Sequence, residues 1–234
     1  MYDPIELSKK TEKLVLKNNL KKYYRFRPTR FYGGISTADT VGCNLRCRFC
    51  WSQNSVWNPN KTGKFYSPKE VSDRIQKIAK KKGYKCLRIS GGEPTIGKKH
   101  LIEVLKNIDS RYIFILETNG ILLGYDKGYV EDLSSFENLH VRVCVKGADP
   151  EEFSLFTGAN TGFNYQIKAL ENLREKKVSF NIALVSKNLE KKKGFFQMLS
   201  DKKLNTFMVE EEEIKLYSMV RNRLKKEGIL DYFN

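Results

Sequence analysis

The sequence is short of histidine, of long apolar runs and of paired cysteines. It has two histidines in 234 residues, His100 and His140, and neither stands in a paired ligand spacing. No run of about 18 apolar residues occurs, so we expect no membrane-spanning segment. The first residues, MYDPIELSKKTEK, lack the apolar stretch of a signal peptide. We therefore expect a cytoplasmic protein whose thiols stay reduced.

The chain is also too short for a complete eight-fold β/α barrel, which usually needs about 250 residues. Its length suits one domain that buries a core without disulfide staples. The five cysteines are an odd number, and three of them fall within eight residues. That distribution favours metal ligation over a disulfide framework.

The charge is strongly one-sided. The chain has 43 Lys and Arg residues against 27 Asp and Glu residues, which leaves a formal net charge of +16. Such a balance is typical of nucleic-acid-binding proteins, but also of lysine-rich thermophile surfaces. A basic protein also attracts any anionic small molecule. The charge therefore leaves open whether RNA, a small anion or only solvent contacts the basic residues.

From residue 33 onwards, strand-like and helix-like periodicities alternate, which predicts β/α units and a parallel sheet. One helix start is clear, because Ser67 is followed by Pro68 and Glu70 as in a capping box. About six strands are expected, so the fold class is α/β with an open, partial barrel. The expected strands cover 35–41, 85–90, 112–117, 139–145, 178–185 and 204–209.

Two further parts flank this core of residues 33–209. Residues 1–32 are a basic N-terminal extension in which aromatic and arginine residues alternate. We interpret it as an amphipathic helix and an extended arm packed on the domain, with an RNA- or anion-contacting arm as the alternative. Residues 210–234 predict a C-terminal helix from Glu210 to Glu227, whose acidic start and basic end match the helix dipole.

Cys43, Cys47 and Cys50 lie in VGCNLRCRFCW, directly after the first core strand. Three thiolates on one short loop can converge on a single inorganic centre. A structural zinc site normally needs a fourth ligand, and Cys86 and Cys144 are expected to be small buried residues instead. An iron–sulfur cluster can be held by three cysteines, which leaves one iron open for a ligand. The motif favours this cluster, with zinc as the alternative.

The C-x3-C-x-aromatic-C pattern, with Phe49 in the aromatic position, resembles the hallmark of the radical S-adenosylmethionine (SAM) superfamily. The segment Gly91-Gly92-Glu93-Pro94-Thr95 resembles its GGE motif, which holds the amino group of SAM. Two motifs in this order are more specific than either alone. The resemblance implies a partial (β/α)6 TIM-type barrel and two cofactors, SAM and a [4Fe-4S] cluster on the three cysteines.

The resemblance further implies reductive cleavage of SAM to a 5′-deoxyadenosyl radical, which abstracts hydrogen from a substrate. Lys146 is expected to pair with the SAM carboxylate, and Trp51 to pack near the cluster or the adenine. No catalytic side chain is expected beyond the cluster and the SAM site, and a flavodoxin- or ferredoxin-like protein is expected to donate the electron. The expected cofactor-binding residues are Phe49, Trp51, Gly91, Gly92, Glu93, Glu117, Asn119 and Lys146.

Within the superfamily, residues 146–173 are similar to the activating enzymes of glycyl radical enzymes, such as pyruvate formate-lyase activating enzyme. A glycyl radical enzyme partner is therefore the expected substrate, although Cys144 departs from the Asp usual there. One alternative is tRNA, because Cys50-Trp51 resembles the Cys-Trp of the radical SAM enzymes of tRNA wybutosine synthesis. The motifs are also compatible with a small-molecule or cofactor precursor as substrate, and with a non-enzymatic iron–sulfur electron carrier.

Overall fold

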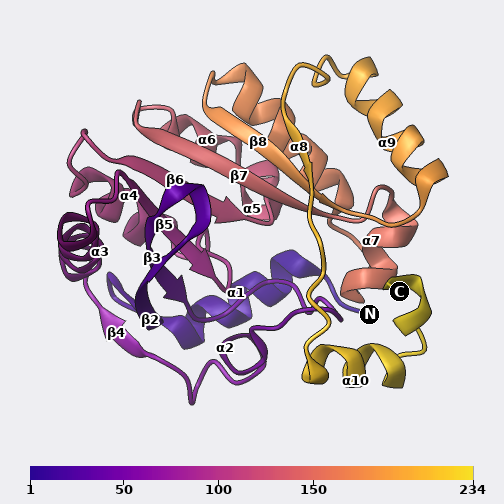
Figure 1. The fold of residues 1–234 in the computed structure, drawn as a ribbon, viewed down its shortest axis with the longest axis horizontal. Helices are drawn as coiled ribbons and strands as arrows, with labels where there is room; N and C mark the ends of the chain where they lie inside the picture. The colour runs from indigo at the N-terminus through magenta and orange to yellow at the C-terminus, as the bar shows by residue number, and fades with distance from the viewer. Residues whose placement is uncertain (234) are drawn as a thin grey trace.

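The computed structural model describes residues 1–233, in which nine strands form one mixed sheet with helices packed against it (Figure 1). Six neighbouring strands are parallel, as the alternating periodicities predict, and the sheet is not closed. The predicted open, partial barrel is confirmed. The parallel strands are β3 (Ile35–Thr40), β5 (Cys86–Gly91), β6 (Ile113–Thr118), β7 (Leu139–Lys146), β8 (Ser179–Val185) and β9 (Val209–Glu211).

Helices connect these strands as crossovers. α3 (Pro68–Lys82) begins with the predicted capping box at Ser67 and ends at Gly83, whose φ of 69° is left-handed. Its apolar positions recur every three or four residues and are buried. The other helices of the core are α2 (Gln53–Trp57), α4 (Lys98–Lys106), α5 (Ile121–Tyr125), α6 (Lys127–Leu133), α7 (Pro150–Thr157), α8 (Phe163–Glu175) and α9 (Leu189–Asp201).

The two faces of the sheet differ in polarity. In β7, Val141, Val143 and Val145 are fully buried, whereas Arg142 and Cys144 alternate with them on the other face. The apolar face packs into the core formed with the helices. The opposite face carries charged side chains and is open to solvent at the carboxyl ends of the strands.

The N-terminal extension joins the sheet. After α1 (Pro4–Val15) and the short β1 (Leu16–Lys17), the predicted extended arm forms β2 (Leu20–Thr29). β2 pairs antiparallel with β3 and also with β1 and β4 (Lys64–Tyr66). The arm is therefore a sheet strand, followed by the 3-10 turn η1 (Phe31–Gly33).

The predicted C-terminal helix begins later than expected. α10 covers Ser218–Lys226, because Glu210 and Glu211 belong to β9 and the main-chain N–H of Glu212 donates to Leu184 O at 2.8 Å. Residues 212–217, which we call the strap, are extended and lead from β9 to α10 (Figure 1). The turn η2 (Leu230–Phe233) follows. Among residues 1–233, no helix is long and apolar enough to span a membrane.

Candidate active site

A cavity of about 190 Å³ lies at the carboxyl ends of the parallel strands. It is lined by residues that follow β3, β5, β6 and β7, together with part of the strap. All of the cofactor-site residues predicted from the sequence contribute to its wall. They are Cys43, Cys47, Phe49, Cys50, Trp51, Gly91, Gly92, Glu93, Glu117, Asn119 and Lys146.

The cysteine loop follows β3 and is held by its own main chain. The N–H of Leu45 donates to Cys43 Sγ at 3.3 Å, and the N–H of Cys50 donates to Cys47 O at 3.0 Å. Burial raises the pKa of all three thiols, that of Cys47 to about 12. The thiols are therefore protonated without a metal, and a bound metal centre displaces their protons.

Asn44 tests whether this loop fits a cluster. Its side chain is fully buried next to Cys43, and its Oδ1 accepts from Asn119 Nδ2 at 2.7 Å. Its Nδ2 has no hydrogen-bond partner among the described residues. A buried donor without a partner is costly unless a ligand accepts from it. An amide donor next to the Cys43 thiol suits a sulfur atom of an iron–sulfur cluster, whose potential such bonds tune.

No group of three or more His, Cys, Asp or Glu side chains in residues 1–233 is arranged to hold one metal ion. The three thiols line a common cavity instead of meeting at one point. A [4Fe-4S] cluster suits this arrangement, because each thiolate binds a different iron atom. The residues present therefore fit the cluster better than a zinc ion.

Two glycines let the loop after β5 contact the cysteine loop. A Cβ on Gly92 would lie 2.0 Å from Gly42 O, and a Cβ on Gly91 would lie 2.8 Å from the N of Thr40. Main-chain hydrogen bonds fill this contact, from Gly92 N to Thr40 O at 2.9 Å and from Glu93 N to Gly42 O at 2.7 Å. The two predicted motifs are thus adjacent, and their glycines serve the contact between them.

The carboxylate of Glu93 is occupied within the protein. It is 1% exposed. Its Oε1 accepts from Thr95 Oγ1 and Thr118 Oγ1 at 2.6 Å, and its Oε2 accepts from Asn119 N at 2.8 Å. These bonds tie the loop to the end of β6. The cofactor role of Glu93 stays a prediction, and its carboxylate is fully paired within the protein.

Glu117 also has partners inside the protein. It accepts from Arg88 Nη1 at 2.9 Å and from Ser90 Oγ at 2.7 Å. These residues lie on the polar face of β5 and β6. Glu117 therefore joins two neighbouring strands at the cavity wall, and its predicted contact with SAM stays untested.

Lys146 ends β7, and its Nζ lies 3.2 Å from Glu212 Oε2 and 5.6 Å from the ring centroid of Phe49. Burial disfavours its charge, but Glu212 raises its pKa above the ordinary value. Burial likewise favours neutral Glu212, but Lys146 and Arg142 hold its pKa below the ordinary range. The cavity therefore contains a cation that a carboxylate of the strap already pairs.

Trp51 and Cys144 complete the wall. Trp51 is 52% exposed, and its ring centroid lies 5.7 Å from that of Tyr217 on the strap. It therefore lies at the rim. Cys144 lines the cavity with its Sγ 3.3 Å from Arg142 Nη1, and burial raises its pKa to about 12. Cys86 does not contribute to this wall.

A larger cavity of about 840 Å³ adjoins the first, and the two share Trp51, Glu117 and Glu212. Its wall is close to charge balance, although the chain carries +16. Most of the excess positive charge therefore lies elsewhere. The cationic residues of this wall are Arg25, Arg27, Arg88, Arg142 and Lys215, and the anionic ones are Asp39, Glu117, Glu210, Glu211, Glu212 and Glu213.

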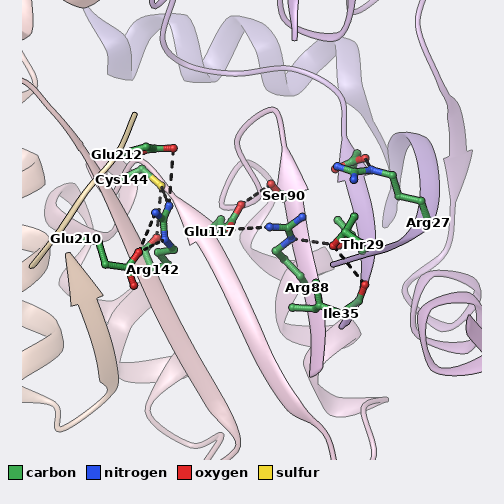
Figure 2. A network of polar contacts seen from close by, with 12 residues as sticks. Arg27, Thr29, Ile35, Arg88, Ser90, Glu117, Arg142, Cys144, Glu210 and Glu212 are labelled. Atoms are coloured by element: carbon green, nitrogen blue, oxygen red, sulfur yellow. Dashed lines mark hydrogen bonds and ion pairs between the residues drawn. The ribbon is translucent and has the colours of Figure 1, made fainter. Parts of the chain in front are cut away.

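Ion pairs fix the guanidinium groups of this wall. Figure 2 shows Arg88 paired with Glu117, at 2.9 Å, and Arg142 paired with Glu210, at 3.1 Å. Arg25 and Arg27 both donate to the buried Asp39. The wall of the larger cavity thus carries oriented charged groups of both signs, and is not a surface of one charge.

Several of these residues were missed by the sequence predictions. Arg142 had a usable signal, because a period of two in β7 places it on the same face as Lys146. No pattern in the sequence marked Glu212 as a cavity residue, because the run from Glu210 to Glu213 also matches the start of a helix. Asn44 is similarly indistinguishable from a surface residue in the sequence.

The family model of the radical SAM superfamily matches residues 38–197, more than half of the chain. The chain belongs to the radical SAM superfamily. This radical SAM protein uses a [4Fe-4S] cluster and SAM, as the superfamily does. The cofactors predicted from the two motifs are confirmed at this level.

Similar curated proteins are GTP 3′,8-cyclases. One from Haemophilus influenzae (strain PittGG) is 29% identical over 185 residues, which cover 78% of this chain and 50% of the relative. A probable GTP 3′,8-cyclase from Archaeoglobus fulgidus is 33% identical over 135 residues, which cover 54% and 41%. This radical SAM chain spans about half the length of the curated relatives that it matches.

Solved radical SAM structures share the fold. Streptococcus suis SuiB bound to S-adenosylmethionine has a TM-score of 0.56 at 21% identity, covering 85% of this chain and 43% of SuiB. Native anSMEcpe with bound AdoMet has a TM-score of 0.55 at 23% identity, covering 82% and 58%. TYW1 with a lysine-pyruvate adduct bound has a TM-score of 0.53 at 16% identity, covering 84% and 72%.

These comparisons support the superfamily and not the predicted branch. The relatives named above are cyclases rather than activating enzymes of glycyl radical enzymes. They favour the alternative of a small-molecule precursor over the expected protein partner.

Proposed function

We propose that this radical SAM enzyme abstracts hydrogen from a polar small molecule bound in the larger cavity. The observation that carries the proposal is the shared wall of the two cavities, because a molecule bound in the larger one would lie next to the proposed cofactor site. The oriented ion pairs around the larger cavity suit a ligand with several polar groups. The sequence similarity to GTP 3′,8-cyclases supports the same class of substrate.

In this proposal the chain's own residues bind and orient the cofactors. Cys43, Cys47 and Cys50 hold the cluster, with Asn44 as a donor to one of its sulfur atoms. The main chain of residues 91–93 binds the amino group of SAM. When bound, the cluster and SAM supply the reductive cleavage chemistry.

Lys146 has a second role in the proposal, as the partner of the SAM carboxylate. Its ion pair with Glu212 must open for this to happen, because the ammonium lies 3.2 Å from Glu212. We propose that Glu212 then turns toward Arg142, which lies 3.9 Å away and lines the larger cavity. The exchange would connect SAM binding to the substrate side of the site.

GTP is the first substrate to test, because the curated relatives are GTP cyclases. The reconstituted protein is incubated anaerobically with SAM, dithionite and GTP, and 5′-deoxyadenosine is measured by mass spectrometry. We expect faster formation with substrate, and transfer of deuterium from labelled substrate into 5′-deoxyadenosine. Dithionite replaces the proposed flavodoxin- or ferredoxin-like donor.

Two variants locate the substrate. Arg27→Gln, which alters the larger cavity but not the smaller one, should raise the substrate KM roughly tenfold and spare basal SAM cleavage. Arg30→Gln, at an exposed arginine outside both cavities, is the control. Cys47→Ala should abolish both basal SAM cleavage and the reaction with substrate. Stimulation by a protein or RNA fraction, with none by small molecules, would reject the proposal.

A further inference from the structure

A lysine of the N-terminal extension reaches the loop that follows β5. Lys21 lies on β2, is 1% exposed, and places its Nζ among three main-chain carbonyl groups. It donates to Ile96 O at 2.6 Å, to Pro94 O at 2.7 Å and to Glu93 O at 3.3 Å. An ammonium group has three N–H donors, so this site uses its full capacity.

The remaining carbonyl of this loop is also held. Tyr129, which is 2% exposed, donates its hydroxyl to Thr95 O at 3.0 Å. Every main-chain carbonyl from residue 93 to residue 96 therefore accepts from a buried side chain. The carboxylate of Glu93 ties the same loop to β6. The loop is thus held by hydrogen bonds to its main-chain carbonyl groups and by the bonds of the Glu93 carboxylate to the end of β6.

The burial of Lys21 is costly, which implies a specific role. A buried ammonium without a contacting carboxylate loses much of its hydration energy. The carboxylate of Glu93 attracts it, but already accepts from Thr95, Thr118 and Asn119. The hydrogen bonds to the carbonyl groups are therefore what holds Lys21 in place, and their direction sets the orientation of the loop.

We propose that Lys21 is a positioning residue for SAM. By fixing residues 93–96, it keeps the main chain of Gly91, Gly92 and Glu93 in the orientation that binds the amino group of SAM. The inference rests on the proposed assignment of residues 91–93 to SAM. Lys21 lies outside the part of the chain that the superfamily model matches, residues 38–197. It is therefore a contribution of this chain's own N-terminal extension.

The adjacent residue provides a matched control. Lys22 is 8% exposed and also donates to two main-chain carbonyls, Pro59 O at 2.8 Å and Asn60 O at 3.1 Å. Neither of these acceptors lines the smaller or the larger cavity. Lys22 thus performs the same structural task for a loop that does not bind SAM.

The experiment compares Lys21→Met with Lys22→Met in the reconstituted protein. Both variants should lower the Tm and leave the iron content unchanged. Lys21→Met alone should raise the KM for SAM roughly tenfold, with kcat at saturating SAM within about twofold of wild type. The EPR spectrum of the reduced cluster should also change only at correspondingly higher SAM concentration. Lys21→Gln, which retains two N–H donors, should give an intermediate KM.

Three results would overturn the inference. They are an unchanged KM for SAM in Lys21→Met, an equal KM shift in Lys22→Met, or a fall in iron content that accounts for the lost activity. If Lys21→Met fails to fold, the KM of Lys21→Gln decides by the same criterion. Failure of the proposed function would look different, because small molecules would then not stimulate the wild-type protein, whereas the KM for SAM in basal SAM cleavage could still be compared between the variants.

Discussion

Residues 1–37 and 198–233 flank the part of the chain that the superfamily model matches. Each of these two flanks contacts one of two neighbouring loops, the loop after β5 or the cysteine loop. The N-terminal flank contacts the loop after β5 from behind, through the buried Lys21. The C-terminal flank contacts the cysteine loop, because Arg223 donates to the carbonyl groups of Arg48 and Cys50. Neither loop is supported by the core alone.

The flanks differ in how they hold their loops. The N-terminal contacts of Lys21 are buried and made to main-chain groups, and His100 contacts the flank at one main-chain carbonyl, that of Asn19, and at the hydroxyl of Tyr23. The C-terminal flank uses ion pairs in addition to the main-chain bonds of Arg223: Lys146 with Glu212, which is largely buried, and Arg48 with Glu227, which is partly exposed. Hydrogen bonds to main-chain groups fix a loop, whereas an ion pair between side chains can be exchanged for one with a charged ligand. We infer that the first flank is scaffold and the second responds to binding.

Arg223→Met gives the largest expected effect in this comparison. The guanidinium donates to two carbonyl groups of the cysteine loop and lies 4.8 Å from the ring centroid of Trp57. Loss of two charge-assisted hydrogen bonds should free the loop, so iron should transfer to a chelator roughly tenfold faster. Absorbance of the cluster follows the loss. Arg221→Met, at an exposed arginine of the same helix, is the control, and equal rates would contradict the prediction.

Glu212→Gln tests whether Glu212, on the strap, gives up its ion pair with Lys146 when SAM binds. The amide cannot neutralise Lys146, so the SAM carboxylate no longer competes with an internal carboxylate. We expect the Kd of SAM to fall roughly fivefold, measured by calorimetry with the reconstituted protein. Glu190→Gln is the control, because its ion pair with Lys193 is exposed and lies outside both cavities. Weaker SAM binding in Glu212→Gln would show that Glu212 supports the site instead.

The smallest expected effect concerns the buried contacts of the N-terminal flank. His100 is 2% exposed and contacts Tyr23 Oη at 3.0 Å and Asn19 O at 2.8 Å. Burial lowers its pKa from 6.5 to about 4. Because the unfolded chain then binds a proton that the folded chain does not, this contribution to stability is lost as pH falls from about 6.5 toward 4.

Between pH 7.5 and 5.5 this loss amounts to roughly 1 kcal/mol, or about 3 °C in Tm. Circular dichroism of the wild-type protein and of His100→Gln measures it. The variant should lose correspondingly less Tm over the same pH interval. An equal loss in both proteins would mean that His100 is not held neutral by the flank.

Five of the six parallel strands were predicted well, because they depend on local patterns, and the expected cofactor residues line one cavity, although their roles stay predictions. The sixth strand was wrong, because it was expected at 204–209 but β9 covers Val209–Glu211 and turns precede it. The period of two in β7 and the capping box of α3 are determined within a few residues. The start of the C-terminal helix was wrong, because tertiary contacts outweigh local preference there. Glu210 bonds to Arg142 and Glu212 bonds to Lys146, so both take part in the sheet and its wall.

The branch of the superfamily could not be predicted, for a different reason. The residues that resemble the activating enzymes have structural roles here. Asp149 caps α7 by accepting from Glu152 N at 2.7 Å, and Gly158 ends that helix with a φ of 73°. Ala169 and Leu170 are fully buried. Such residues report the fold, and therefore the superfamily, but not the substrate.

The contact between Gly92 and Gly42 has a consequence for dynamics. The amides of Gly92 and Glu93 are bonded to the strand end and loop that carry the cysteines. Exchange of these two amides with solvent therefore requires both loops to open together, as one cooperative unit. Loss of the cluster would then also loosen the loop that follows β5, without a ligand between the two loops. The cofactor sites are, in this sense, a single unit of local unfolding.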